Sequence, residues 1–172
     1  MIFPPLPGDG RVLFFIRDQH EFGFLSHFHP AEIELDGETW PTVEHWYQAQ
    51  KSSDPRYREA IRSASTPGRA KRLAGMPVSS RRDHGSWFLA NGLLPREDWE
   101  AVKRDLMRRA DAAKYDQHRD LAARLLATGG AEIVEDSPHD AHWGIGRTGL
   151  GANWAGRILM EVRDGLRSRK IL

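Results

Sequence analysis

The chain has 172 residues, 40% hydrophobic and 28% charged, which suits one folded domain and excludes a disordered chain. Its 25 Lys and Arg residues nearly balance 24 Asp and Glu residues, and the formal charge of +1 excludes a surface that is basic throughout. Cysteine is absent, which excludes disulfides, thiolate metal sites and a cysteine nucleophile.

The first forty residues carry the clearest strand signals. Residues 1–11, rich in Pro and Gly, are predicted to form an irregular lead-in without a signal peptide, and residues 12–16 a short buried strand. Residues 31–35 and 38–40 are predicted to form a hairpin, because the Asp-Gly turn at 36–37 tolerates positive φ angles. The longest apolar run is far shorter than the roughly 20 residues of a membrane span, so we expect a soluble, cytoplasmic protein without membrane contact.

Helical patterns dominate the rest of the chain. A short strand is expected at residues 132–135, and no repeat or linker divides the sequence. We therefore expect a single mainly α domain over residues 1–172 with a small antiparallel β element, an α+β fold. Caps, prolines and apolar spacing predict helices over residues 42–51, 55–64, 67–73, 95–113, 117–127 and 153–166.

The first cluster with chemical potential lies on the helix that Thr42 is expected to cap. Glu44 then occupies the first turn, where the helix dipole favours a negative charge. Gln48 and Lys51 follow on the same face, four and seven residues later. Two interpretations are open: a polar stripe that binds a ligand bearing donors and acceptors, or an ordinary capped helix with an intrahelical salt bridge.

The second cluster is the glycine-rich segment at residues 140–156. Gly144, Gly146 and Gly149 match GxGxxG by letter, but too little chain follows to complete a dinucleotide-binding fold. Glycines still allow backbone amides to approach an anion, beside the helix N-terminus expected at Asn153. The alternative is a flexible surface loop.

A third cluster combines Trp99 with basic side chains. Arginine presents a fork that suits phosphate, so this face is a candidate for binding a phosphorylated ligand. The other interpretation is a solvated basic face, with Trp99 in the core stripe of its helix. The basic residues are Arg69, Lys71, Arg72, Lys103, Arg104, Arg108 and Arg109.

The eight histidines do not form a recognisable metal motif. His27 and His29 make an HxH pair, but Glu44-His45 lacks the second histidine that an HExxH helix needs. The GxSxG elbow of a serine hydrolase is also missing from the sequence. We therefore expect neither a bound metal nor a cofactor.

Four stretches together match a known family pattern. They are FLSHF at 24–28, WPTVEHWYQAQK at 40–51, the segment 106–114, and the segment 140–153 with its following helix. Through them the chain resembles the NADAR (YbiA-like) family over about residues 22–166. The resemblance implies a mainly helical fold, in agreement with the periodicity.

The resemblance also implies an N-glycosidase that hydrolyses a ribose C1′–N bond next to a phosphate. Family members cleave phosphoribosylamino-pyrimidine intermediates of riboflavin synthesis, or remove ADP-ribose from guanine in DNA. The expected partners are thus a phosphoribosyl or ADP-ribosyl small-molecule substrate and ADP-ribosylated DNA. By the resemblance, Glu44, Trp99 and Asp140 are the catalytic residues.

Glu44 and Asp140 are expected to converge in one cleft around the ribose. One carboxylate would orient water or stabilise an oxocarbenium-like sugar while the other assists the departing base, and either assignment of the two roles is open. The remaining candidates are expected to bind the substrate. They are Ser26, His27, Phe28, His45, Gln48, Lys51, Arg69, Trp143, Gly144, Gly146, Gly149, Gly151 and Asn153.

Several positions depart from the family pattern. Leu25 and His27 replace its usual phenylalanine and asparagine, Ser52 replaces a phenylalanine, and Ile145 replaces an acid. The departures at Leu25, His27 and Ile145 favour an alternative, a non-catalytic module that binds ADP-ribose or a related nucleotide. Residues 77–94 resemble an insertion. Its basic and aromatic residues suggest a third possibility, an enzyme that contacts nucleic acid through Arg81, Arg82, Trp87 and Phe88.

Overall fold

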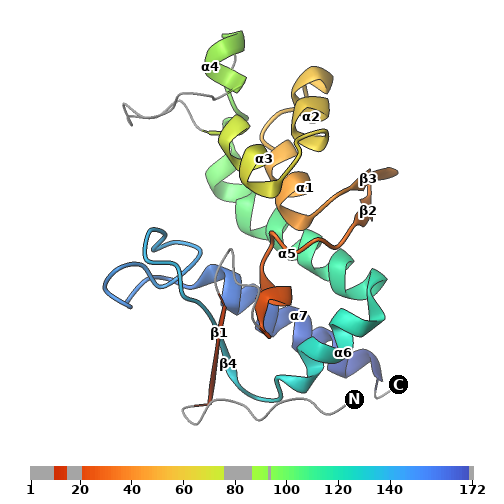
Figure 1. The fold of residues 1–172 in the computed structure, drawn as a ribbon, viewed down its shortest axis with the longest axis vertical. Coiled ribbons are helices and arrows are strands. Elements are labelled where there is room, and N and C mark those ends of the chain that lie inside the picture. The colour runs from red at the N-terminus through yellow and green to blue at the C-terminus, as the bar shows by residue number, and fades with distance from the viewer. Residues whose placement is uncertain (1–9, 15–20, 76–86, 93, 171–172) are drawn as a thin grey trace. The chain divides into compact units, whose positions relative to one another are not determined.

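The computed structural model describes residues 10–14, 21–75, 87–92 and 94–170 (Figure 1). These residues belong to two compact units, each described here by itself. We call them the terminal unit (Met1–His29 and Asp111–Leu172) and the central unit (Pro30–Ala110). The prediction of a single domain over residues 1–172 stays a prediction.

The terminal unit is built on a pair of parallel strands, β1 and β4 (Figure 1). Arg11 pairs with Glu132, and alternate β1 side chains, Val12 and Phe14, are buried. Helix α7 packs against β4, and α6 packs against α7, so the strands and both helices share a core. The elements are β1 (Arg11–Phe14), the 3-10 helix η1 (Gly23–Leu25), α6 (Arg119–Ala127), β4 (Glu132–Glu135) and α7 (Trp154–Lys170).

The central unit combines a hairpin with a group of short helices. Asp36 and Gly37 have φ angles of 57° and 76°, as the predicted Asp-Gly turn requires. Helix α1 packs against α2 and α3, each of which begins with a proline behind a side-chain cap, Asp54 or Thr66. The elements are β2 (Ile33–Leu35), β3 (Glu38–Trp40), α1 (Val43–Ala49), α2 (Pro55–Arg62), α3 (Pro67–Leu73) and α4 (Trp87–Asn91).

Helix α5 (Trp99–Gln117) contributes residues to both units, with the boundary between Ala110 and Asp111. It begins four residues after the Pro95 start that the sequence suggested and ends four residues after position 113. The predicted fold class, mainly helical with a small antiparallel hairpin, is confirmed. The parallel pairing of β1 with β4 is an addition, because both strands were expected but not as partners.

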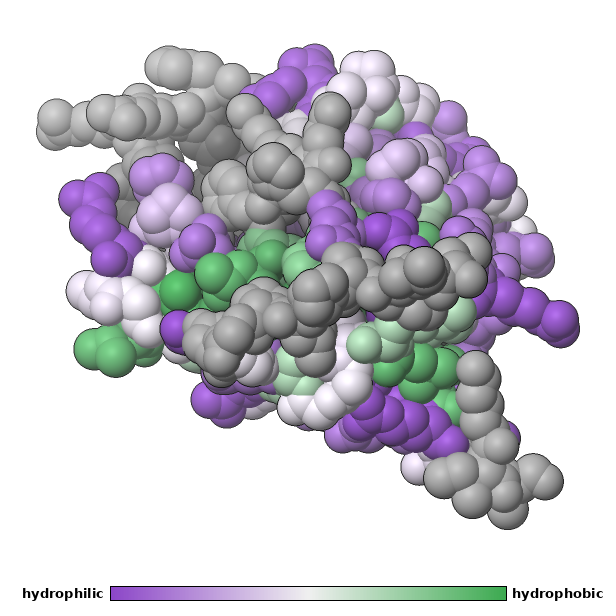
Figure 2. Space-filling view, turned by 60° about the horizontal axis from the view of Figure 1, so that its bottom comes forward, coloured by the Kyte–Doolittle hydropathy of each residue, from purple (hydrophilic) through white to green (hydrophobic). Residues whose placement is uncertain are grey.

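Parts of the predicted lead-in, of the strand at 12–16 and of the insertion at 77–94 lie outside the described residues. Within the described part of the insertion, residues 87–91 form helix α4. Of the helices described, none is both long and apolar enough to cross a membrane. Figure 2 shows hydrophilic residues over much of the described surface on one face, with smaller hydrophobic areas between them.

Candidate active site

The start of α1 is fixed by a local network around His45. The Thr42 hydroxyl caps the helix by accepting from the His45 backbone N–H at 3.3 Å. His45 Nε2 lies 3.0 Å from the Ala64 carbonyl, which can only accept, so Nε2 carries the hydrogen. His45 Nδ1 then accepts from the Thr42 hydroxyl at 2.8 Å. Burial lowers the pKa of His45, which favours this neutral ring. His45 therefore fixes the helix start on which Glu44 stands.

Glu44 and Gln48 form a buried pair on α1. Gln48 Nε2 donates to Glu44 Oε1 at 2.8 Å, and each residue is 4% exposed. The Gln48 backbone carbonyl accepts from the Tyr57 hydroxyl, which ties this turn of α1 to α2. Gln48 Oε1 is buried and has no hydrogen-bond partner within the described chain. The predicted polar stripe is thus present, but it is packed inside the unit and not solvated.

Lys51 and Trp99 meet at the end of the same stripe. Lys51 Nζ donates to the Ala74 carbonyl at 3.0 Å and lies 5.3 Å from the centre of the Trp99 ring. The Tyr47 ring lies 4.9 Å from the Trp99 ring, at 52° between the ring planes. Trp99 is 5% exposed, so it belongs to the core, where it also contacts Tyr47 of α1. Lys51 of the first predicted cluster and Trp99 of the third are therefore in contact with each other.

Three of the basic residues of the third cluster form ion pairs. Lys103 pairs with Glu100 and Arg108 with Asp105, each three residues away on α5 and each exposing its acid to solvent. Arg109 pairs with Asp36 in the hairpin turn. These contacts support the interpretation of a solvated, ion-paired face. Arg69, by contrast, is exposed at the start of α3.

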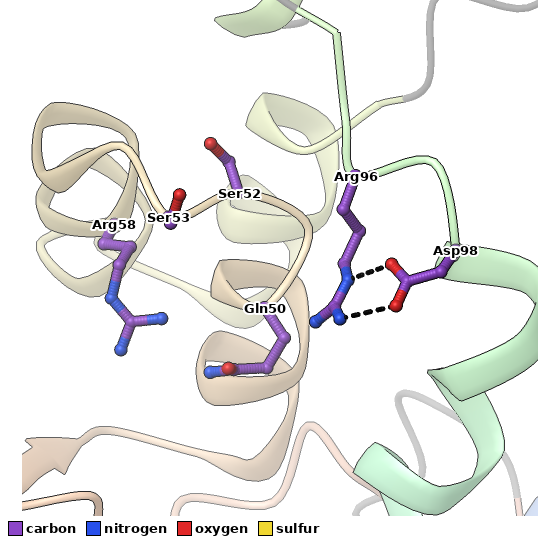
Figure 3. Close-up of a pocket in the computed structure, with 6 residues that line it drawn as sticks. All are labelled: Gln50, Ser52, Ser53, Arg58, Arg96 and Asp98. Carbon is purple, nitrogen blue, oxygen red and sulfur yellow. Dashed lines mark hydrogen bonds and ion pairs between the residues drawn. The ribbon is translucent and has the colours of Figure 1, made fainter.

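A polar pocket of about 370 Å³ lies at the end of α1 and was not predicted (Figure 3). In Figure 3, Arg58 and Arg96 lie on either side of Gln50, and Arg96 forms two bonds to Asp98. The Arg96 backbone N–H donates to the Lys51 carbonyl at 2.8 Å, which joins this wall of the pocket to the chain just after α1. The pocket is lined by Gln50, Ser52, Ser53, Arg58, Arg96 and Asp98.

Trp87 of the predicted insertion packs against α2. The Trp87 ring lies 5.4 Å from the Tyr57 ring, edge to face, and Arg56 lies 5.8 Å from it. Trp87 thus has packing partners on α2. Arg81, Arg82 and the Phe88 side chain lie outside the described residues, so contact of the insertion with nucleic acid stays a prediction.

In the terminal unit, Asp140 orders the start of the glycine-rich loop. Its Oδ1 accepts from the backbone N–H groups of His142 and Trp143, at 2.9 and 2.8 Å. The Gly144 N–H donates to the Asp140 carbonyl, and the Gly151 N–H to the Ile145 carbonyl. A backbone bonded in this way is an ordered turn, which argues against a flexible surface loop.

Two predicted loop glycines are required for close packing and two for backbone conformation. A Cβ on Gly144 would lie 2.6 Å from the Glu135 carbonyl, and one on Gly151 would lie 2.4 Å from the Gly144 carbonyl. Gly146 and Gly149 have φ angles of 64° and 71°, in the left-handed region. The backbone N–H groups of residues 146–148 and 150 have no acceptor within the described chain, so these are the amides that suit an anion.

Asn153 attaches the end of the loop to β4. Its side chain accepts from the Glu135 N–H at 3.0 Å and donates to the Ile133 carbonyl at 2.9 Å, with φ at 51°. Gly156 lies against the same carbonyl, and a Cβ there would come within 1.9 Å of it. The Asn153 side chain therefore bonds the β4 backbone as a neighbouring strand would. It holds the end of the loop against β4 in addition to preceding α7.

The segment 24–28 meets the loop and α5 within this unit. The His27 ring is perpendicular to the Trp143 ring, 6.5 Å between centres, and His27 Nε2 is 3.0 Å from Asp111 Oδ2. Lys114 Nζ donates to the Phe24 and Ser26 carbonyls. Burial lowers the pKa of Lys114 to about 8. Three of the family stretches thus converge here.

Ser26 and Phe28 form a local turn beside this contact. The Ser26 hydroxyl oxygen accepts from the Phe28 backbone N–H at 3.1 Å, and Ser26 is 3% exposed. Asp111 and Lys114 were not predicted as site residues. The signal available for them was their position within the third family stretch, 106–114.

The structure thus groups the candidates by unit. In the described residues, no cluster of three His, Asp or Glu side chains is arranged to hold a metal ion. The prediction that Glu44 and Asp140 meet around one ribose involves both units and stays a prediction. The central unit gathers Glu44, His45, Gln48, Lys51 and Trp99, and the terminal unit gathers Ser26, His27, Asp140, Trp143 and the loop.

Known proteins resemble the chain over nearly all of its length. N-glycosidase YbiA of Escherichia coli K12 is 41% identical over 159 residues, covering 92% of this chain and 91% of that protein. N-glycosidase Npun_R5314 of Nostoc punctiforme is 36% identical over 160 residues, covering 91% and 94%. Riboflavin biosynthesis protein VVA0006 of Vibrio vulnificus is 38% identical over 156 residues, which are 91% of this chain but 39% of that longer protein.

A solved structure and a family model agree with these relatives. The NMR structure of E. coli YbiA matches with a TM-score of 0.75 and 39% identity, over 92% of this chain and 87% of the other. The family model of the NADAR domain matches residues 13–167. The resemblance inferred from four sequence stretches is therefore confirmed, and the chain belongs to the NADAR family.

Proposed function

We propose that this chain is an N-glycosidase that hydrolyses the ribose C1′–N bond of a phosphate-bearing, nucleoside-like substrate. The relatives named N-glycosidases match more than nine-tenths of the chain, which supports the reaction class. The observation that carries the proposal is the Glu44 carboxylate, buried in the first turn of α1 and held in place by Gln48. A buried acid in a fixed orientation is what cleavage of a riboside requires.

Glu44 supplies negative charge where the reaction develops positive charge. As the C1′–N bond lengthens, the ribose becomes oxocarbenium-like, and a carboxylate stabilises this sugar or orients the attacking water. The Gln48 Nε2 amide can only donate, so Glu44 Oε1 is an acceptor. Oε2 has no hydrogen-bond partner among the residues described, and we assign this oxygen to the sugar or the water.

Aromatic and basic groups beside Glu44 suit the rest of the substrate. Trp99 and Tyr47 offer ring surface for a base or ribose, next to the Lys51 ammonium. We assign the phosphate to Lys51, to Arg69 and to the loop amides of residues 146–148. The remaining predicted ligand residues, His45 and Asn153 among them, act in this proposal by holding these groups in place.

The proposal includes Asp140 as the second catalytic carboxylate. Two loop amides occupy its Oδ1, so Oδ2 is the oxygen that can reach a substrate. The same two bonds orient Trp143, which is half-buried and offers a further ring surface. Asp140 therefore combines a structural task in the loop with a charge beside the ribose.

Two substrate classes fit these groups. Relatives from Vibrio vulnificus and Zea mays are named riboflavin biosynthesis proteins, which favours a phosphoribosylamino-pyrimidine. The second candidate, ADP-ribose linked to guanine in DNA, is favoured by the exposed Arg69 on α3, which packs against α1, since a diphosphate or DNA backbone needs cationic contacts.

One assay separates these candidates. The protein is offered a phosphoribosylamino-pyrimidine and guanine-ADP-ribosylated DNA in parallel, and mass spectrometry follows release of the sugar phosphate. We expect hydrolysis of the pyrimidine compound at least tenfold faster, a barrier difference of about 1.4 kcal/mol. Tight binding of ADP-ribose by calorimetry without cleavage of either compound would instead identify a non-catalytic binding module and reject the proposal.

A further inference from the structure

The polar pocket at the end of α1 has no role in the proposed function. All of its lining residues belong to the central unit, and each of them is polar or charged. Its volume of about 370 Å³ lies within the range of small-molecule sites, roughly 300–1,000 Å³. Two guanidinium groups line it from separate segments, Arg58 on α2 and Arg96 just before α5 (Figure 3). The pocket is therefore a candidate for a second ligand site.

Arg58 is held in a fixed orientation and keeps most of its donors. Its side chain is 21% exposed, and its guanidinium carbon lies 5.1 Å from the centre of the Trp40 ring. Its Nη2 donates to Glu38 Oε2 at 2.5 Å. A guanidinium has five N–H donors, and the others of Arg58 have no acceptor within the described chain. Arg58 can therefore bond an anion in the pocket without releasing Glu38.

Arg96 supplies a second set of donors from the other side of Gln50. Its Nε and Nη2 donate to the two Asp98 oxygens at 2.5 and 2.8 Å. Both hydrogens on Nη1 have no acceptor among the residues described. The bond from the Arg96 backbone N–H to the Lys51 carbonyl fixes the position of the residue. One edge of this guanidinium is thus oriented by Asp98, and the other is left for a ligand.

Hydroxyl and amide groups complete the pocket. Gln50 Nε2 donates to the Trp46 carbonyl at 3.1 Å, and Gln50 Oε1 is an acceptor without a partner in the described part of the chain. The Ser52 hydroxyl oxygen accepts from the Asp54 backbone N–H, so its hydrogen can still be donated. Ser53 adds a second hydroxyl. The hydroxyls and guanidinium groups suit phosphate oxygens, and the amide oxygen suits a hydroxyl of the same ligand.

Donor geometry, more than net charge, selects the ligand of this pocket. Among the lining residues, the two arginines and Asp98 leave one net positive charge. Glu38 pairs with Arg58 and lies 3.7 Å from Arg62, which also pairs with Glu59, so acids outside the pocket offset the cations of α2. The planar arginine fork matches the oxygens of phosphate. A phosphate fits these donors better than a cation or an apolar group does.

We propose that this pocket binds the phosphate group of a small hydroxyl-bearing molecule, at a site separate from Glu44. Glu44 lies in the first turn of α1 and Gln50 caps its C-terminal end, so they are about 9 Å apart along the helix. Two sources supply such a phosphate. One is a remote phosphate of the substrate itself, and the other is a separate phosphorylated molecule.

Glycerol 3-phosphate is the probe, because it carries a phosphate and hydroxyls but neither ribose nor base. Amide NMR spectra of the isotope-labelled protein follow its titration at constant pH. We expect the amide signals of Ser52, Ser53 and Arg96 to shift and to saturate. Sodium chloride at equal ionic strength controls for screening and should give no saturating shift. Signals that respond to the two salts alike would overturn the proposal.

Arg58→Gln and Arg62→Gln form a matched pair on α2. Both arginines lie beside Glu38, but of the two only Arg58 lines the described pocket. The Kd for glycerol 3-phosphate should rise about tenfold or more in Arg58→Gln, because a charged donor is lost, and stay within about twofold in Arg62→Gln. Equal dissociation constants in the two variants would contradict the assignment of Arg58.

Asp98→Asn should change binding in the opposite direction. Asparagine keeps an oxygen for Arg96 and is a favoured residue before a helix, so the exposed position tolerates it. Loss of a negative charge from the lining should lower the Kd about two- to fivefold. This variant decides the question if Arg58→Gln does not fold, since a merely structural role would not tighten binding. Unchanged or weaker binding would overturn the proposal.

Steady-state kinetics distinguish the two sources of the phosphate, and only this measurement rests on the proposed N-glycosidase function. If the phosphate belongs to the substrate, Arg58→Gln should raise KM about tenfold at unchanged kcat. If it belongs to a separate molecule, both constants should stay unchanged. Either result agrees with a phosphate site. A wild-type protein that binds glycerol 3-phosphate in this pocket but cleaves no N-riboside would reject the proposed function and leave the site standing.

Discussion

Glu44 of the central unit and His27 of the terminal unit are held in place by different kinds of contact. Glu44 is fixed by neighbours on its own helix, the Thr42 cap before it and Gln48 one turn after it. In the terminal unit, Asp111 holds His27 from 84 positions away, and Lys114 reaches the Ser26 carbonyl from 88. Local contacts form with the helix itself, whereas distant ones require the finished fold. Substitutions in the two units should therefore change the free energy of unfolding by different amounts.

The largest expected effect is on catalysis, from Glu44→Gln and Asp140→Asn. Each amide keeps an oxygen that can accept the existing hydrogen bonds, so the fold is retained while the charge is lost. We expect kcat/KM to fall at least about 10³-fold in each variant, roughly 4 kcal/mol of barrier, with the melting temperature unchanged. Steady-state kinetics on the preferred substrate and thermal melting measure the two effects.

Glu59→Gln is the control for these variants. Glu59 is an exposed α2 acid that pairs with Arg62, so its loss should leave the rate within about twofold. Near-normal turnover by Glu44→Gln would remove the catalytic role of α1. Near-normal turnover by Asp140→Asn alone would reduce the loop to a structural element.

The second effect is on stability and concerns two glycines of α7. A Cβ on Gly156 would lie 1.9 Å from the Ile133 carbonyl, whereas one on Gly165 would meet nothing within 4 Å. We expect Gly156→Ala to lower the free energy of unfolding by about 3 kcal/mol through overpacking. Gly165→Ala should raise it by about 1 kcal/mol, because alanine favours a helix. Urea unfolding measures the stability of both variants, which carry their substitutions on the same helix. Equal stabilities would contradict this prediction.

The sequence predicted best what neighbouring residues determine. The Asp-Gly turn, the Thr42 cap and the helix after Pro67 all depend on residues within a few positions, and all are present. The stripe of Glu44 and Gln48 was predicted from spacing of four. Its burial was not, because burial depends on which distant elements cover the helix.

Distant partners explain most of what the sequence did not show. The parallel pairing of Arg11 with Glu132 joins residues more than a hundred positions apart, and no local pattern encodes it. The Asp111 partner of His27 has the same origin. In the loop, the glycine spacing suggested amides open to an anion, yet the Gly144 and Gly151 amides bond within the turn.

A smaller effect on stability is expected from Thr42, whose contacts are local. Its hydroxyl accepts from the His45 N–H and donates to His45 Nδ1, so Thr42→Ala should lower the free energy of unfolding by about 1 kcal/mol. Thr42→Ser retains the hydroxyl and should stay within a few tenths of a kcal/mol. Urea unfolding measures both, and equal losses in the two variants would show that the methyl group and not the cap is responsible.

The smallest effect is the pH dependence of stability that His29 of the terminal unit causes. Burial, followed by the charges of Lys114 and Arg124, lowers the pKa of folded His29 to about 4, against 6.5 for the unfolded chain. As pH falls from about 6.5 to 4, the unfolded chain binds a proton that folded His29 does not, so the free energy of unfolding falls. Solvent screening at this partly buried ring limits the loss to roughly 1 kcal/mol.

His29→Gln should flatten that pH dependence, measured by urea unfolding at several pH values between 7 and 4.5. A residual slope of the same sign is expected from His45, whose pKa burial also lowers. A His29→Gln variant with the full wild-type slope would contradict this assignment and show that other groups carry the proton-linked stability.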